Sequence, residues 1–177
     1  MNKKLEEIQD KFIQQIMANM KSYGFPSTIG HVLAVIYYEN KPLSLDELSE
    51  RTGMSKTRMS QVVREMVHLN IAEKVFVKGT RKDYYRVEED YYRTFISLFT
   101  SNWKTVAMRN TRTDQTIYKD LQELHASDDL SEEEHQLVEM YIEDTKESMA
   151  YFDWVNRLVD FFESEEVFKY VPKKKIE

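Results

Sequence analysis

Residues 44–69 read SLDELSERTGMSKTRMSQVVREMVHL, and this stretch decides the fold. Ser44 followed three residues later by Glu47 forms a capping box, so a short helix is predicted to begin there and to end at Gly53. Ser55 is placed to cap a second helix that runs to the end of the quoted stretch. A short capped helix, a glycine turn and a longer helix at this spacing indicate a helix-turn-helix.

The side chains of the second helix separate into an apolar face and a polar face. At 3.6 residues per turn, the apolar face collects Met59, Val62, Val63 and Met66. The opposite face collects hydroxyl, amide, guanidinium and imidazole groups, from Thr57, Gln61, Arg64 and His68, with Ser60 on the flank. An Arg side chain can pair with guanine and a Gln side chain with adenine, so this face suits direct readout in the major groove.

Basic residues at the start of this helix and in a following hairpin predict contacts to the DNA backbone. Residues 72–77 and 83–87 are rich in β-branched and aromatic side chains, so they are predicted strands, with a basic turn at 78–82. Such a wing can follow phosphates or enter the minor groove. The predicted DNA-binding residues are Ser55, Lys56, Thr57, Arg58, Ser60, Gln61, Arg64, Lys78, Arg81 and Lys82.

A polar helix face alone does not separate a DNA-binding surface from an ordinary solvated one. Three features favour DNA binding here: Glu65 is the only acid on the face, the helix-turn-helix spacing is right, and a basic hairpin follows. Residues 51–86 hold nine Lys or Arg and three Asp or Glu, whereas the whole chain has a net charge of -6. A basic module on an acidic body keeps the positive field on one surface.

Two longer stretches resemble a known family. They are YGFPSTIGHVLAVIYYENKPLSLDELSERTGMSKTRMSQVVREM (residues 23–66) and VKGTRKDYYRVEEDYY (residues 77–92). Residues 45–87 resemble a winged helix of the MarR superfamily, and nearly the whole chain resembles its GbsR branch, whose members repress choline and glycine betaine genes. The resemblance implies a dimeric repressor that releases or changes its grip on DNA when it binds a small ligand.

Gly and Pro are scarce, at four and three residues, so most of the chain is predicted to be helical. Helices are expected at 3–23 and 28–39, from Glu89 onward, in a shorter segment around Leu121, and from a second capping box at Ser131. The predicted fold is mainly α with a small β-hairpin wing, a winged helix-turn-helix joined to a helical dimerisation layer. The expected domains are 1–26 (N-terminal dimerisation helix), 27–88 (DNA-binding domain) and 89–177 (dimerisation and effector region).

A homodimer is expected because one recognition helix reads only a few base pairs, whereas two helices about 34 Å apart read successive turns of the groove. We therefore predict a sequence-specific transcriptional regulator that binds an operator in double-stranded DNA. The resemblance implies that it represses genes for choline or glycine betaine uptake or synthesis. The alternative is a protein-interaction adaptor that keeps the winged helix without specific DNA or ligand binding.

Aromatic residues make up 12% of the chain, and their ordinary role is packing in a core or a dimer interface. They can also hold a quaternary ammonium ion, which donates no hydrogen bonds and is attracted to aromatic faces. The resemblance favours this second interpretation, with choline as the effector. The predicted ligand set shares one helix face after the wing and comprises Tyr92, Phe95, Phe99 and Trp103, and Tyr151 with Trp154 forms a second set.

Other chemistry is not predicted. The chain has no cysteine, which excludes a disulfide, a thiolate zinc site and a cysteine nucleophile. It shows no Gly-rich phosphate loop or serine nucleophile motif, and its four histidines have no metal-ligand spacing, so no enzyme activity, cofactor or metal is expected. The N-terminus lacks an apolar signal region and no stretch approaches the roughly 18 apolar residues of a membrane span, so a cytoplasmic location without a membrane partner is expected.

Overall fold

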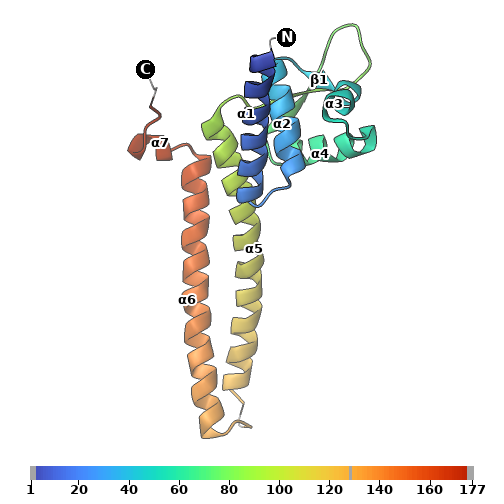
Figure 1. The fold of residues 1–177 in the computed structure, drawn as a ribbon. Coiled ribbons are helices and arrows are strands. Elements are labelled where there is room, and N and C mark those ends of the chain that lie inside the picture. The colour runs from blue at the N-terminus through green and yellow to red at the C-terminus, as the bar shows by residue number, and fades with distance from the viewer. Residues whose placement is uncertain (1–2, 128, 175–177) are drawn as a thin grey trace. The chain divides into compact units, whose positions relative to one another are not determined.

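A computed structural model describes residues 3–127 and 129–174 of the chain (Figure 1). Its elements are α1 (Lys3–Ser22), α2 (Ser27–Glu39), β1 (Leu43–Ser44), α3 (Leu45–Thr52), α4 (Lys56–His68), β2 (Ala72–Val75), β3 (Tyr84–Val87), α5 (Tyr91–His125), α6 (Glu132–Glu163) and α7 (Val167–Tyr170). The chain divides into two compact units, one through Leu98 and one from Phe99. Residues 1–2, 128 and 175–177, which belong to the expected domains 1–26 and 89–177, lie outside the described residues.

The first unit is a winged helix-turn-helix, as predicted. Helices α3 and α4 are followed by an antiparallel sheet in the order β1-β3-β2. The register pairs Val75 with Tyr84 at the wing end of β2 and β3, and Leu43 with Tyr85 between β1 and β3. The two-residue strand β1 was not predicted, because it forms only through its pairing with β3. The predicted fold class, mainly α with a β-hairpin wing, is confirmed.

The loop between the two strands of the wing is longer than predicted, because both strands are shorter. The strands were expected to reach Val77 and to resume at Asp83, but the ladder ends at Val75 and resumes at Tyr84. Strand propensity produces a ladder only where a partner strand is in register. Beyond the last pair, Asp83 instead holds Lys74 in an ion pair of 2.9 Å.

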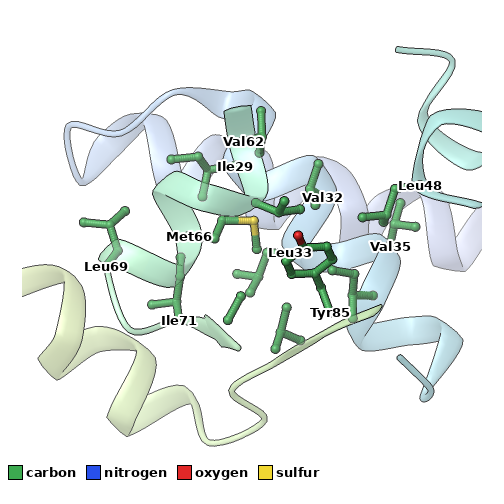
Figure 2. Packing of buried hydrophobic residues seen from close by; sticks show 14 of the residues in the cluster. Ile29, Val32, Leu33, Val35, Leu48, Val62, Met66, Leu69, Ile71 and Tyr85 are labelled. Carbon is green, nitrogen blue, oxygen red and sulfur yellow. The ribbon is translucent and has the colours of Figure 1, made fainter. Parts of the chain in front are cut away.

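The core of the first unit lies between α2, α4 and the sheet (Figure 2). Helix α2 is apolar around most of its circumference, and Ile29 and Val32 are completely buried. From α4, Met66 enters the same cluster, and Ile71 and Tyr85 reach it from the sheet side. Because each fully buried side chain of this size contributes about 1.5–3 kcal/mol, this packing fixes the orientation of α4.

Helices α1 and α2 approach each other closely at Gly30. A β-carbon at this position would lie 2.7 Å from the Cα atom of Met17 and 2.9 Å from the carbonyl oxygen of Ile16. Only glycine leaves room for the α1 backbone there. The contact ties the N-terminal helix to the central helix of the winged domain.

The second unit is a helical hairpin in which the described parts of α5 and α6 run antiparallel, side by side (Figure 1). Three contacts set its register: the rings of Phe99 and Phe162 (centroids 4.7 Å apart), the Ser148 hydroxyl with Asp114 (2.6 Å), and the rings of His125 and His135 (5.5 Å). On α6, Val138, Thr145, Val155 and Val159 are buried. The capping box predicted at Ser131 is present, and Glu134 closes it.

The prediction of two helices between Glu89 and His125 was wrong, because α5 is one continuous helix of 35 residues. A polar run at residues 109–116 obscures the apolar period in the sequence. Within the helix, threonines of this region donate hydrogen bonds to carbonyl oxygens four residues earlier, such as Thr113 to Arg109 at 3.0 Å. The Thr113 and Thr116 hydroxyls are therefore satisfied without a break in the helix, whereas the buried Thr111 hydroxyl has no hydrogen-bond partner among the described residues. Among the described helices, none is long and apolar enough to span a membrane.

Candidate nucleic-acid interface

The turn between α3 and α4 is held by side chains of α3. Gly53 ends α3 in the left-handed region with φ 69°, where glycine carries no steric penalty. The Ser49 hydroxyl donates to the Met54 carbonyl oxygen at 2.5 Å, and the Thr52 hydroxyl accepts from the Met54 backbone N–H at 3.3 Å. These bonds fix the angle at which the chain enters α4.

Both helices of the motif begin at the predicted caps. The Ser44 backbone N–H donates to Glu47 at 2.8 Å, and the Ser44 hydroxyl accepts from the Glu47 backbone N–H, which confirms the capping box. The hydrogen bonds from Ser44 hold the pKa of Glu47 below its ordinary value. Ser55 accepts from the Arg58 backbone N–H at 3.2 Å and so caps α4.

Helix α4 presents one face to the core and the other to solvent. Met59, Val62, Val63 and Met66 are buried, as their spacing predicted. The seven α4-side members of the predicted DNA-binding set lie on the outside: Ser55, Lys56, Thr57, Arg58, Gln61 and Arg64 are exposed, and Ser60 is half-buried. Their polar groups are therefore accessible for contacts to a duplex.

Two arginines of this face have defined positions in the free chain. Arg58 donates to the Gln61 side-chain oxygen at 3.5 Å and to the Thr28 hydroxyl at 3.4 Å. Arg64 donates from Nε to the Ser60 carbonyl oxygen at 3.0 Å. A guanidinium has five donors, so each retains donors for a base or a phosphate.

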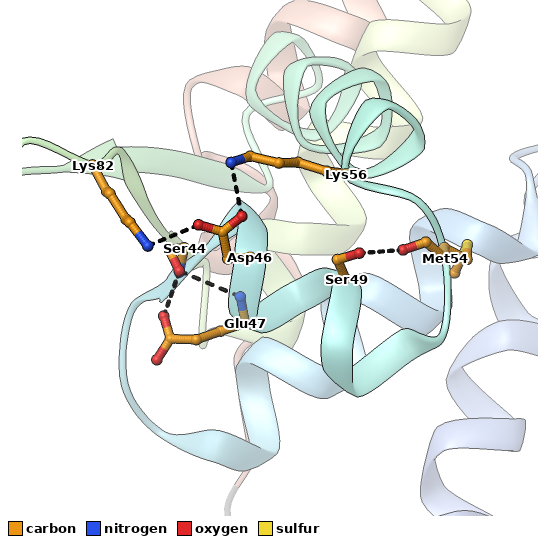
Figure 3. Close-up of polar contacts among 7 residues, drawn as sticks. All are labelled: Ser44, Asp46, Glu47, Ser49, Met54, Lys56 and Lys82. Carbon is orange, nitrogen blue, oxygen red and sulfur yellow. Dashed lines mark hydrogen bonds and ion pairs between the residues drawn. The ribbon is translucent and has the colours of Figure 1, made fainter.

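The wing carries the remaining predicted DNA-binding residues, and it is joined to α4 through one carboxylate (Figure 3). Lys78, Arg81 and Lys82 are all exposed. Asp46, the second residue of α3, forms ion pairs with Lys56 of α4 at 2.7 Å and with Lys82 of the wing at 2.8 Å.

Hydrogen bonds from Lys56 and then Lys82 lower the pKa of Asp46 to about 2. The sequence alone does not indicate this role for Asp46, because its partners lie 10 and 36 positions away and no local pattern marks them.

Another feature that the sequence did not predict is the exposure of an aromatic side chain on the wing. Phe76, expected inside a strand, follows the last residue of β2 and is 86% exposed. The wing surface therefore combines three cations with one large apolar side chain.

The predicted ligand residues lie on α5, and one of them lines a cavity. Tyr92 and Phe95 are exposed, and Phe99 and Trp103 are half-buried with ring centroids 6.4 Å apart. Phe95 lines a cavity of about 150 Å³ in the first unit, and among the described residues the other three are not part of its lining.

This cavity is lined by aromatic rings and carboxylates that the sequence did not group together. Besides Phe95, the lining includes Tyr23, Tyr37 and Tyr91, with Glu88 and Glu89. The rings of Tyr37 and Tyr91 lie 5.6 Å apart, and burial together with the neighbouring Tyr37 raises the pKa of Tyr91 above its ordinary value. The Tyr91 phenol therefore remains neutral across the physiological range.

Histidines and acidic residues do not form a metal site in the part of the chain that the structure describes. No group of three or more metal-ligating side chains is assembled among those residues. The hairpin does bring His125 and His135 into ring contact, which requires the folded pairing of α5 with α6.

The fold and this surface define a class of protein: a winged helix-turn-helix transcriptional regulator with a helical hairpin. A solved structure described as a transcriptional regulator has the same fold, with a TM-score of 0.65 at 14% identity over 93% of this chain and 99% of that one. The hairpin matches the family model for the C-terminal helical hairpin of GbsR family transcriptional regulators over residues 91–169.

Two curated relatives from Bacillus subtilis (strain 168) extend the match over nearly the whole chain. The HTH-type transcriptional repressor OpcR is 53% identical over 97% of this chain and 92% of its own length. The HTH-type transcriptional repressor GbsR is 30% identical over 95% of this chain and 93% of its own. The chain belongs to the GbsR family of transcriptional regulators.

Proposed function

We propose that this regulator is a repressor that binds operator DNA as a homodimer, with α4 in the major groove and the wing on the adjacent backbone. The observation that carries the proposal is the surface made by the exposed face of α4 and the three wing cations. Base-reading groups lie on the helix and phosphate-binding groups on the wing, which is the division that sequence-specific readout requires.

Base readout is tested by removing one side chain from the middle of α4. Arg64→Ala is expected to weaken binding by about 1–3 kcal/mol at one base position and to relax sequence preference there. Gln61→Ala is expected to do the same at another position. Equal ratios of affinity for selected and shuffled duplexes in wild type and both variants would contradict the assignment.

The wing is tested by the salt dependence of binding. Replacing Arg81 and Lys82 with Ala removes two cations, so the slope of log affinity against log salt is expected to flatten by up to about two. Binding to all sequences is expected to weaken together. A protein-interaction adaptor, the alternative function, would show no steep salt dependence in the wild type.

The proposed homodimer is supported by exposed apolar side chains on the long helices. On α6, four large apolar residues that are 44–50% exposed form a stripe outside the buried face: Leu137, Met140, Tyr151 and Trp154. On α1, Leu5, Ile8 and Phe12 are 40–53% exposed. Apolar stripes of this length are typical of protein–protein interfaces, and a second copy of the chain would cover them.

The proposed effector is a small quaternary ammonium compound, with choline as the first to test. Its support is the family resemblance and the aromatic residues of α5, the predicted set Tyr92, Phe95, Phe99 and Trp103. The cavity beside Phe95 supplies tyrosine rings and two carboxylates, which are also groups that hold an organic cation. Its volume is below the roughly 300–1,000 Å³ of most ligand pockets, so it suits a small molecule.

Calorimetry with choline tests whether the chain binds this effector. Two variants then distinguish between two binding sites, the aromatic residues around Trp103 and the cavity beside Phe95. Trp103→Ala is expected to remove the response to choline and to leave DNA affinity nearly unchanged. Tyr37→Ala instead alters the cavity wall and is expected to remove the response if the cation binds there. Absence of heat at millimolar choline in the wild type would contradict the effector proposal and would leave the DNA-binding proposal unaffected.

A further inference from the structure

Asp46 is the point at which the recognition helix and the wing meet. It projects from the first turn of α3, between Ser44 and Glu47 of the capping box, so its backbone position is fixed (Figure 3). Its two carboxylate oxygens are used separately: Oδ1 accepts from Lys56 at 2.7 Å, and Oδ2 accepts from Lys82 at 2.8 Å. One side chain therefore sets the distance between two cations that come from different elements.

These ion pairs contribute little to the free energy of unfolding. The side chains of Lys56 and Lys82 are 62% and 61% exposed, and that of Asp46 is 43% exposed. Ion pairs in such positions are screened by water and salt. What the pairs change is the freedom of the two lysines, because a lysine side chain without a partner samples many rotamers.

The position of a phosphate-binding cation matters for sequence readout. Contacts to phosphates fix the register and orientation of a protein on the duplex, and base contacts then read the sequence from that register. Lys56 lies at the N-terminal end of α4, one turn before Gln61 and two turns before Arg64. A fixed Lys56 and a fixed Lys82 would therefore place these two side chains at defined base edges.

We propose that Asp46 is a specificity-determining positioning residue, which holds Lys56 of the recognition helix and Lys82 of the wing in one arrangement for the DNA backbone. The inference rests on the proposed DNA binding. The lysines keep donors for phosphate, because each ammonium group has three N–H bonds and uses one on Asp46. The carboxylate also repels phosphates that approach outside this arrangement, which penalises binding in other registers.

Simple charge repulsion makes a different prediction for the same residue. If Asp46 only repelled DNA, its neutralisation would tighten binding to every duplex by the same factor. If Asp46 positions the lysines, its neutralisation lowers the preference for the correct sequence. The ratio of two affinities therefore separates the two explanations, whereas a single affinity does not.

The experiment uses the full-length chain and two duplexes, one selected from a random library by the wild type and one shuffled version of equal composition. Asp46→Asn is expected to lower the ratio of the two affinities at least fivefold, with binding to the shuffled duplex unchanged or tighter. Glu50→Gln, which removes an exposed carboxylate from the same helix, is expected to leave the ratio unchanged. In a background with Lys56→Ala and Lys82→Ala, the change at Asp46 is expected to have no further effect on the ratio.

An equal change in both affinities, or a persistent effect without the two lysines, would overturn the inference. Thermal unfolding of Asp46→Asn is expected to match the wild type, which excludes loss of fold as the cause of a changed ratio. If the wild type itself bound no duplex, the proposed function would fail and this inference with it. Retained wild-type selectivity with an unchanged ratio in Asp46→Asn would overturn this inference alone.

Discussion

At the scale of single residues, Asp46 connects three elements that lie apart in the sequence. Its ion pairs with Lys56 and Lys82 predict an unusual titration, because a carboxylate with two ammonium partners resists protonation. Its pKa is about 2 in the folded chain, below the ordinary value of 3.8. A group whose pKa is lowered by folding stabilises the fold above its unfolded pKa, and this contribution is lost as the pH falls through the folded pKa. For these exposed ion pairs the contribution is small, because water and salt screen them.

The titration prediction is therefore that the Asp46 carboxyl group stays ionised down to about pH 2. Carbon-detected NMR of this carboxyl group measures the midpoint directly. In the Lys56→Ala and Lys82→Ala double variant the midpoint is expected to rise toward 3.8, the ordinary value. Lys78→Ala removes another wing cation and is expected to leave the midpoint in place. A wild-type midpoint at the ordinary value would show that the bridge does not form in solution.

Residues with local partners were predictable from sequence, and residues with distant partners were not. Ser44, Ser55 and Ser131 cap helices through bonds within three residues, so their spacing alone identifies them. Asp46 also lies in a recognisable pattern, the acidic first turn of a helix, but its bond to Lys82 spans 36 positions. The sequence therefore predicts the cations of the interface and not the carboxylate that joins them.

At the scale of the elements, the helices of the winged domain were predicted well because their apolar periods are strong. The buried face of α4 recurs at helical spacing, and α2 is apolar around most of its surface. Elements that depend on tertiary pairing were predicted less well. Strand β1 exists through its pairing with β3, and α5 continues through a polar run that the sequence pattern alone does not join.

The close approach of α1 to α2 gives a prediction at this scale. Gly30→Ala would place a methyl group 2.7 Å from the Cα atom of Met17, and a backbone atom cannot rotate away as a side chain can. The better helix propensity of alanine, about 1 kcal/mol, acts in the opposite direction. Overpacking costs about 1–3 kcal/mol, and a clash with backbone atoms belongs in the upper part of that range. After the gain in helix propensity, we expect a net loss in the free energy of unfolding of about 1–2 kcal/mol.

Urea unfolding at one fixed protein concentration measures this loss, since association would change the apparent stability. Gln15→Ala, an exposed change on α1, is the matched control and is expected to alter the free energy of unfolding by less than about 0.5 kcal/mol. A Gly30→Ala variant as stable as the wild type would show that the two helices can separate without cost.

At the scale of the whole molecule, the long helices leave large apolar side chains exposed to water. A two-helix hairpin buries one face of each helix against the other, as Val138, Val155 and Val159 show on α6. The exposed apolar stripe on α6 includes Met140 and Trp154, which are 50% exposed each. Within the described unit, this stripe is not buried against another helix. Exposed apolar rows of this kind are stabilised when another surface removes them from water.

The last prediction is that this stripe forms the interface of a homodimer in solution. Sedimentation at micromolar concentration is expected to give twice the chain mass of 21.2 kDa. Met140→Glu combined with Trp154→Glu places two charges on the stripe, and burying unpaired charges is costly, so the variant is expected to sediment as a monomer. Asp153→Lys is the control: it also changes the charge by two units, but this exposed residue points at least about 100° around the helix from Met140, Tyr151 and Trp154.

If the stripe is the dimer interface, the double variant that loses dimerisation is also expected to lose operator binding. Two recognition helices placed about 34 Å apart contact successive turns of the major groove, and a monomer retains only one of them. The monomeric variant is therefore expected to lose operator affinity steeply while its circular dichroism spectrum stays helical. A wild-type chain that sediments as a monomer, or a double variant that stays dimeric, would exclude α6 as the interface. The winged helix would then have to read its operator as a single unit, with phosphate contacts supplying most of the affinity.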